Sequence, residues 1–156
     1  MLGIFPRVLN LIVRKPMPDN GRSFFDSNVI IYSLSRTGDK SIRAKDLVQT
    51  GGIISVQVLN EVANISARKL SKTWPEINTA LELIRSFCQV VPLTVKTHDT
   101  GRYIAERYKL SVYDAMIVAA AFLADCDILY SEDMQNGMLI NNKLTIVNPF
   151  QTAAIS

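Results

Sequence analysis

Short apolar runs alternate along most of this chain with longer stretches in which apolar residues recur every three or four positions. The short runs predict β-strands and the longer pattern predicts amphipathic helices. Strands are expected at Ser23–Phe25, Gly51–Ser55 (after a turn), Gln89–Leu93, Asp127–Tyr130 and Leu144–Val147. Helices are expected at Asn28–Leu34, continued by Ile42–Val48, and at Val56–Leu70, Glu76–Phe87, His98–Tyr108 and Val112–Ala124. Strands separated by helices indicate βαβ units, and hence an α/β fold with a mostly parallel central sheet.

The beginning of the chain does not follow this alternation. Residues 1–15 are apolar with three basic residues and no acid, and the Pro- and Gly-containing segment 16–21 follows them. A peripheral amphipathic segment or a targeting peptide would be alternatives, but a small-residue cleavage site and a long apolar core are missing. We therefore expect an N-terminal extension and linker at 1–21, one domain at 22–150 and a short tail at 151–156. Met17 is a possible natural start.

Composition narrows the class of protein. A chain of 156 residues with 48% hydrophobic residues favours a single domain with a sizeable core. The formal charge of +3 is a mild excess, compatible with a nucleic-acid partner. Apolar runs stay well short of the ~20 residues that a membrane span needs. The expectation is a soluble cytoplasmic protein with no membrane partner.

Cysteine and histidine usage excludes several kinds of site. Cys88 and Cys126 stand far apart in apolar surroundings, which favours reduced core residues over a disulfide. His98 is the single histidine, so no Cys/His set has zinc spacing. A Ser-His-Asp hydrolase would need that histidine, and no nucleophile motif supports one.

Four acids stand beside walls of apolar residues: Asp26, Glu61, Asp114 and Asp133. Burying a carboxylate without a partner is costly, so these positions need an explanation. Asp26, Asp114 and Asp133 fall at predicted strand-carboxyl or helix-amino ends, which meet at one edge of a parallel sheet. Glu61 falls at the border of the apolar arc of its helix, at ~100° per residue.

Each acid also has a purely structural explanation. Asp26 is a good helix cap, Ser111 with Asp114 resembles a capping box, and Asp133 suits a turn. Glu61 could be a solvated flank residue. Taken together, however, carboxylates converging on one edge would repel unless a cation neutralised them or some held protons. Oxygen ligands without His or Cys indicate a hard ion, Mg²⁺ or Mn²⁺.

These segments resemble, in order and spacing, the PIN-domain ribonucleases, and specifically the VapC toxins of type II toxin–antitoxin systems. Phe25–Tyr32 is similar to the family's Asp-(Ser/Thr)-Asn opening, and Gln57–Glu61 to the helix with its second acid. Leu110–Ala121 and Leu129–Gly137 are similar to the segments with its third and fourth acids. Ser131 stands where the family more often has threonine. The resemblance spans about residues 23–149.

The resemblance implies a three-layer α/β/α fold and a Mg²⁺- or Mn²⁺-dependent endoribonuclease. Asp26 and Asp114 would be direct metal ligands, and Glu61 and Asp133 would act through water or bind a second ion. Asn28 and Ser131 would orient the acids by hydrogen bonds.

The resemblance further implies an RNA substrate, a cognate VapB-type antitoxin and a toxin homodimer. Basic residues that could contact RNA are Arg36, Arg43, Lys45, Arg68, Lys69, Lys72, Arg102, Arg107 and Lys109. Tyr32 and Tyr113 could stack on bases, although core packing is the expectation for both. Two other classes stay open: a non-catalytic binding protein on the same scaffold, and a receiver-like Mg²⁺-binding signalling module.

Overall fold

The computed structural model describes residues 22–151, and all statements below concern that range. Its strands are β1 (Ser23–Phe25), β2 (Gly52–Ser55), β3 (Cys88–Val91), β4 (Ile128–Tyr130), β5 (Leu139–Ile140) and β6 (Leu144–Val147). Its helices are α1 (Ser27–Leu34), α2 (Asp39–Gln49), α3 (Val56–Arg68), α4 (Trp74–Phe87), α5 (Val95–Tyr108) and α6 (Val112–Leu123). The expected N-terminal extension, and the tail beyond residue 151, lie outside the described residues and stay predictions.

The strands form one sheet in the order β3-β2-β1-β4-β6-β5, parallel except for the β5–β6 pair. From β1 the chain builds outward through β2 and β3, and it later returns to the other side of β1 with β4. The crevice between β1 and β4 is therefore the place where the winding direction reverses. Ligands of parallel sheets bind at such a point, beyond the carboxyl ends of the strands.

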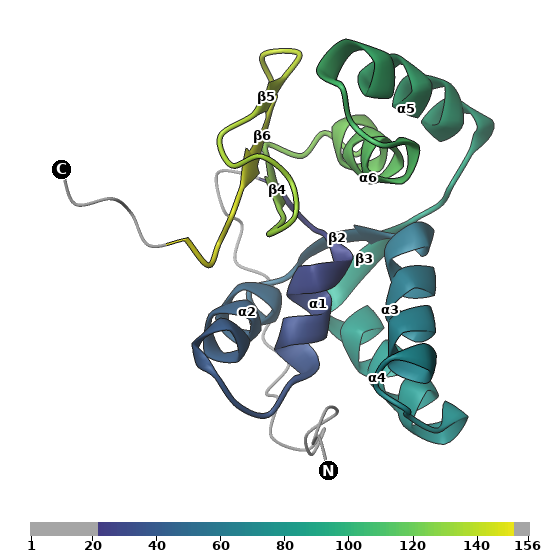
Figure 1. Ribbon diagram of the computed structural model, residues 1–156, viewed down its shortest axis with the longest axis vertical. Coiled ribbons are helices and arrows are strands. Elements are labelled where there is room, and N and C mark those ends of the chain that lie inside the picture. The colour runs from purple at the N-terminus through teal and green to yellow at the C-terminus, as the bar shows by residue number, and fades with distance from the viewer. Residues whose placement is uncertain (1–21, 152–156) are drawn as a thin grey trace, which may run out of the picture.

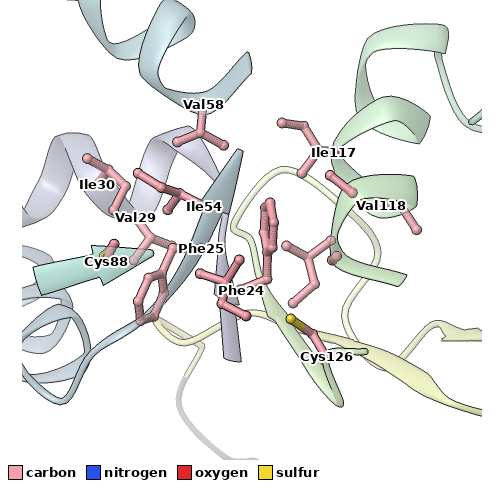
Figure 2. Close-up of a cluster of buried hydrophobic side chains, with 14 of the residues drawn as sticks. Phe24, Phe25, Val29, Ile30, Ile54, Val58, Cys88, Ile117, Val118 and Cys126 are labelled. Atoms are coloured by element: carbon pink, nitrogen blue, oxygen red, sulfur yellow. The ribbon is translucent and has the colours of Figure 1, made fainter. Parts of the chain in front are cut away.

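Helices cover both faces of the sheet, which confirms the three-layer α/β/α expectation. Helices α5 and α6 lie together on one side, and α1 to α4 form a connected group on the other (Figure 1). Consecutive residues of β1 point to opposite faces, as strand geometry requires. Phe24 points toward Ile117 of α6, and Phe25 toward Val29 of α1 (Figure 2). Both phenylalanines are fully buried, so the short strand β1 anchors both halves of the core.

The structure differs from the sequence prediction in two places. The helical character expected to continue from Asn28–Leu34 into Ile42–Val48 is interrupted between the two segments. Helix α1 ends at Leu34 because Ser35 is extended, with a ψ of 150°, and Gly38, with a φ of 107°, precedes α2. Strand β5 was not predicted: its two residues are too few to show an alternating pattern, and it pairs antiparallel with β6. The remaining elements match their predicted positions to within three residues.

Both cysteines are free and buried, as expected. Burial raises the pKa of the Cys88 thiol to about 12 and that of Cys126 to about 11. These thiols stay protonated near neutral pH and serve as core residues (Figure 2). None of the described helices is long and apolar enough to cross a membrane.

Candidate active site

Asp26 lies at the carboxyl end of β1, in the crevice between β1 and β4. Its backbone N–H donates to the Tyr130 carbonyl at 3.0 Å, and the residue is only 4% exposed. Oδ1 accepts the Ser27 N–H at 2.7 Å, and Oδ2 accepts the Ser131 hydroxyl at 2.7 Å. Asp26 therefore caps α1, as the capping explanation predicted, and is also fixed in the crevice by Ser131, which follows the neighbouring strand.

Asn28 links two of the predicted acids. Its Oδ1 accepts the Glu132 N–H at 3.1 Å, which directs the amide nitrogen the other way. That nitrogen donates to Asp26 Oδ2 at 3.3 Å and to Asp133 Oδ2 at 3.2 Å. Asn28 thus bonds both Asp26 and Asp133, while Asp133 itself remains exposed.

Glu61 reaches the same region from the second turn of α3. It is partly buried, and its Oε1 has no hydrogen-bond partner among the described residues. Burial, and then the charges of Asp26 and Asp114, raise the pKa of Glu61 to about 7, although polar contacts of the carboxyl group with the Ser27 and Gln57 side chains lower it in part. An unsatisfied, buried acceptor is rare in folded proteins and indicates a missing partner.

Asp114 stands in the first turn of α6, three residues after the N-cap Ser111. The Ser111 hydroxyl accepts the Asp114 N–H at 3.2 Å, so the predicted cap is present. The return bond of a capping box is not formed, so the Asp114 carboxylate is not engaged at the cap. The negative charge of Asp114 instead acts on Asp26 and Glu61 and contributes to the raised pKa of both. Burial is the larger cause of the raised pKa of Asp26, and Asp133 adds to it.

A second set of side chains supports the loop after β4. Glu132 Oε1 accepts the Tyr32 hydroxyl at 2.9 Å, and Oε2 pairs with Lys40 Nζ at 2.5 Å. Tyr32 packs edge-on against Phe150, with 5.0 Å between ring centroids. This support was not predicted from the sequence. It ties Ser131 and Asp133, on either side of Glu132, to α1 and α2.

The four predicted acids therefore interact, but as an open group. Among residues 22–151, no three His, Cys, Asp or Glu side chains are gathered closely enough to make a ready metal cage. Even so, Asp26 is influenced by Asp114 and Asp133, and Glu61 by Asp26 and Asp114. The mutual repulsion, the all-oxygen donors and the orphaned Glu61 Oε1 fit a hard divalent cation, which keeps several waters of its own.

The chain also has a pocket next to Glu61, with a volume of about 570 Å³ between α3, α5 and α6. Tyr113 lies at its rim and is 76% exposed, so core packing was the wrong expectation for this residue. For Tyr32 the expectation is confirmed, because it packs against the core. One hint of the pocket is visible in the sequence: Asn60 and Asn64 stand one helical turn apart beside Glu61.

Comparison with protein-family models identifies the architecture. Residues 23–135 match the model described as "PIN domain". The chain belongs to the PIN domain family. The match contains the whole sheet crevice with Asp26, Glu61, Asp114 and Asp133, so the site lies within the PIN domain. A search of curated proteins finds no match.

Solved structures with the same fold support this assignment. A toxin–antitoxin complex from Klebsiella pneumoniae has a TM-score of 0.63 at 21% identity, covering 83% of this chain and 99% of the other. Mycobacterium tuberculosis VapC20, a sarcin–ricin loop cleaving toxin, has a TM-score of 0.59 at 18% identity, covering 71% and 89%. VapBC2 from Rickettsia felis, bound to a promoter DNA fragment, has a TM-score of 0.59 at 17% identity, covering 81% and 98%. At these identities the likeness shows the fold.

The basic residues of the PIN domain divide into two groups. Lys72 is buried, and Lys45 is partly buried and donates to the Ser35 carbonyl and the Ser41 hydroxyl. Neither lysine is well placed to contact the phosphates of RNA. The other predicted basic residues are exposed: Arg36, Arg43, Arg68, Lys69, Arg102, Arg107 and Lys109.

Proposed function

We propose that this PIN domain is a Mg²⁺- or Mn²⁺-dependent endoribonuclease and the toxin of a VapBC-type toxin–antitoxin system. The observation that carries the proposal is the arrangement of Glu61, whose buried Oε1 has no partner in the described residues while burial and the charges of Asp26 and Asp114 raise its pKa to about 7. A cation between these acids would satisfy the orphaned oxygen and offset the repulsion.

Asp26 and Asp114 would hold the ion directly, and Glu61 and Asp133 would complete its surroundings through waters or a second ion. When bound, the ion activates a water molecule for attack on a phosphodiester and stabilises the leaving oxygen. Ser131 and Ser27 keep both oxygens of Asp26 at fixed positions through 2.7 Å hydrogen bonds. The Asn28 amide nitrogen donates to both Asp26 and Asp133 and so keeps the two carboxylates near each other. With a pKa of about 7, Glu61 is partly protonated near neutral pH without a cation, and positive charge beside it favours release of that proton.

The proposed partners follow from the fold and the surface. Toxin–antitoxin complexes are among the structures that share this fold, which supports a VapB-type antitoxin. Several large apolar side chains on the helices are exposed, among them Ile42, Trp74, Val95 and Tyr103. We propose that a protein partner, an antitoxin or a second copy of the chain, covers some of them. We also propose that the protein acts in the cytoplasm, where its RNA substrate is found.

Cleavage of a mixed pool of single-stranded RNA tests the nuclease proposal. The wild type should cut in Mg²⁺ or Mn²⁺ and not in EDTA. Asp26→Asn and Asp114→Asn should each lower the rate by about a hundredfold or more, since each removes a charge that holds the ion. Asp46→Asn, on the exposed face of α2, is the matched control and should cut normally. Normal cutting by Asp26→Asn would overturn the metal-site assignment.

The partner proposals need their own measurements. Light scattering of the purified chain distinguishes a dimer from a monomer. Co-expression with a small protein encoded beside its gene should give a stable complex in which RNA cleavage is suppressed. A chain that stays monomeric, or that cuts RNA equally well in the complex, would contradict the corresponding proposal.

A further inference from the structure

The 570 Å³ pocket is a second feature of the same sheet edge, distinct from the crevice that holds Asp26. It lies beyond the carboxyl ends of β2 and β3, where α3 and α5 begin, and the first turn of α6 closes it. Glu61 is one of its lining residues, so the pocket opens directly onto the acidic site. A volume of this size is typical of pockets that enclose a small organic group.

The residues that line the pocket indicate which part of an RNA strand it could bind. Within the described part of the chain, no lysine or arginine lines this pocket, and Glu61 adds a carboxyl group, so it does not suit a phosphate. Leu93, Val112 and Met116 supply apolar surface. The free polar groups among them are the amides of Asn60 and Asn64, because the hydroxyls of Thr94 and Thr97 bond each other in the cap of α5. Apolar faces with polar edges match a nucleobase, whose ring faces are apolar and whose rim carries donors and acceptors.

Two kinds of side chain are placed to receive such a group. Tyr113 is 76% exposed at the rim, and a base can stack on its ring. Gln57 Nε2 donates to the Tyr113 carbonyl at 3.0 Å, so α3 holds the start of α6, and with it this ring, beside the pocket. Asn60 and Asn64, one turn apart on α3, have no side-chain hydrogen bonds within residues 22–151. Their amides are therefore available to the edge of a base.

We infer that this pocket binds one unpaired base of the RNA substrate, that of a nucleotide adjacent to the phosphate held at the acidic site. The inference rests on the proposed nuclease function and specifies its substrate as single-stranded RNA with a base preference at one position. Tyr113 supplies stacking, which every base can use, and Asn60 and Asn64 supply the hydrogen bonds that discriminate between bases. His98, also in the lining, offers a further ring nitrogen to the base.

Binding of short RNA to the full chain tests this without cleavage. The probes are fluorescein-labelled octamers of adenosine, cytidine and uridine, in EDTA and at low salt, followed by fluorescence anisotropy. The wild type should prefer one octamer. Tyr113→Ala should weaken that complex about 5- to 150-fold, the range for loss of one stacked base, and Tyr113→Phe should retain it. Tyr113 is exposed, so neither substitution disturbs the core.

Asn64→Ala is the test of base reading. It should bring the three octamer affinities closer together, whereas Asn78→Ala, an exposed asparagine on α4, should leave their ratios unchanged. The inference is overturned if no octamer binds, if Tyr113→Ala binds as the wild type does, or if Asn64→Ala leaves the preference intact. A change of oligomeric state in Tyr113→Ala with unaltered RNA affinity would overturn it too, and would assign the pocket to a protein partner.

The two proposals can fail separately. The wild type could show base-selective binding that Tyr113→Ala removes, but no Mg²⁺- or Mn²⁺-dependent cleavage. That result would refute the nuclease proposal and support the base-binding pocket. If the wild type shows metal-dependent cleavage but octamer affinities do not change in the Tyr113 and Asn64 variants, only the base-binding role of the pocket is refuted.

Discussion

Asn28 Nδ2 lies 3.2 Å from Asp133 Oδ2, although the two residues are 105 positions apart in the chain. The same nitrogen also donates to Asp26, so a neutral amide stands between two acids. Two carboxylates placed directly against each other would repel, and a donor between them removes that contact. Asn28 is therefore the residue that lets Asp26 and Asp133 face one site.

Asn28→Asp should disrupt this arrangement. The change removes the amide donor and adds a negative charge beside Asp26 and Asp133. We expect the free energy of unfolding in EDTA to fall by about 1–3 kcal/mol, because a charge-assisted hydrogen bond becomes a repulsion. Urea unfolding at pH 8 measures it. Asn78→Asp, on the exposed surface of α4, adds the same charge elsewhere and should change stability little. Equal stability of the two variants would show that Asn28 does not separate the acids.

Divalent metal should stabilise the wild type. An ion that binds only the folded chain adds about 2.7 kcal/mol at one hundred times its Kd, which raises Tm by about 5–10 °C for a domain of this size. Thermal scans with millimolar Mg²⁺ or Mn²⁺ against EDTA measure the shift. A double variant, Asp26→Asn with Asp114→Asn, should show none. An unchanged Tm of the wild type in millimolar metal would contradict a cation site.

The sequence predicted this site in part. Strand β1 was located to the residue, since Ser23–Phe25 is a short apolar run, and this placed Asp26 at a strand end. What joins Asp26 to Ser131 is the pairing of β1 with β4, a contact across 105 positions. Local periodicity cannot specify such a pairing. The family resemblance gave the expectation that Ser131 orients the acids, but it gave no strand order.

Tertiary contacts that local periodicity does not specify also explain why the burial of Tyr113 was wrongly predicted. The helix beginning at Val112 is apolar on all sides, a pattern that favours burial, and Ala115 to Ala121 are buried. Its first turn is nevertheless exposed, with Tyr113 at the rim of the pocket. A hydrophobic pattern reports which residues favour burial, but whether a neighbouring element covers them depends on tertiary packing. The support of Glu132 by Tyr32 and Lys40 was missed for this reason.

Loss of Glu132 should affect activity more than stability. Its contacts with Tyr32 and Lys40 are partly exposed, and ion pairs and hydrogen bonds exposed to water contribute little to stability. Glu132→Ala should nevertheless lower the RNA cleavage rate about tenfold. Without the Glu132 contacts, the loop that carries Ser131 and Asp133 is no longer held in one position. Lys40→Met, which keeps the Tyr32 bond, should have a smaller effect. Steady-state cleavage and urea unfolding of both variants test this, and a larger defect in Lys40→Met would contradict it.

Glu61 should make the metal-free protein less stable as the pH rises. Its pKa is about 7 in the folded chain and 4.5 ordinarily, so between these values the folded state holds a proton that the unfolded state has lost. The free energy of unfolding therefore falls as pH rises through this window and is lowest above it. Glu61→Gln removes the titration. In EDTA at pH 8 it should be more stable than the wild type by about 1–2 kcal/mol, allowing for solvent screening, and the difference should vanish near pH 4.

Urea unfolding of both proteins from pH 4 to pH 8 in EDTA measures that difference, with Glu82→Gln on the exposed face of α4 as the control. Saturating Mg²⁺ should make the wild type more stable than Glu61→Gln at pH 8. The cation then stabilises the charge of Glu61, whereas the neutral amide of the variant gains no such attraction. A Glu61→Gln difference that stays constant with pH would show that the pKa of Glu61 is the same in the folded and the unfolded state. Burial and the charges of Asp26 and Asp114 would then not raise it, and the argument for a cation beside Glu61 would lose its support.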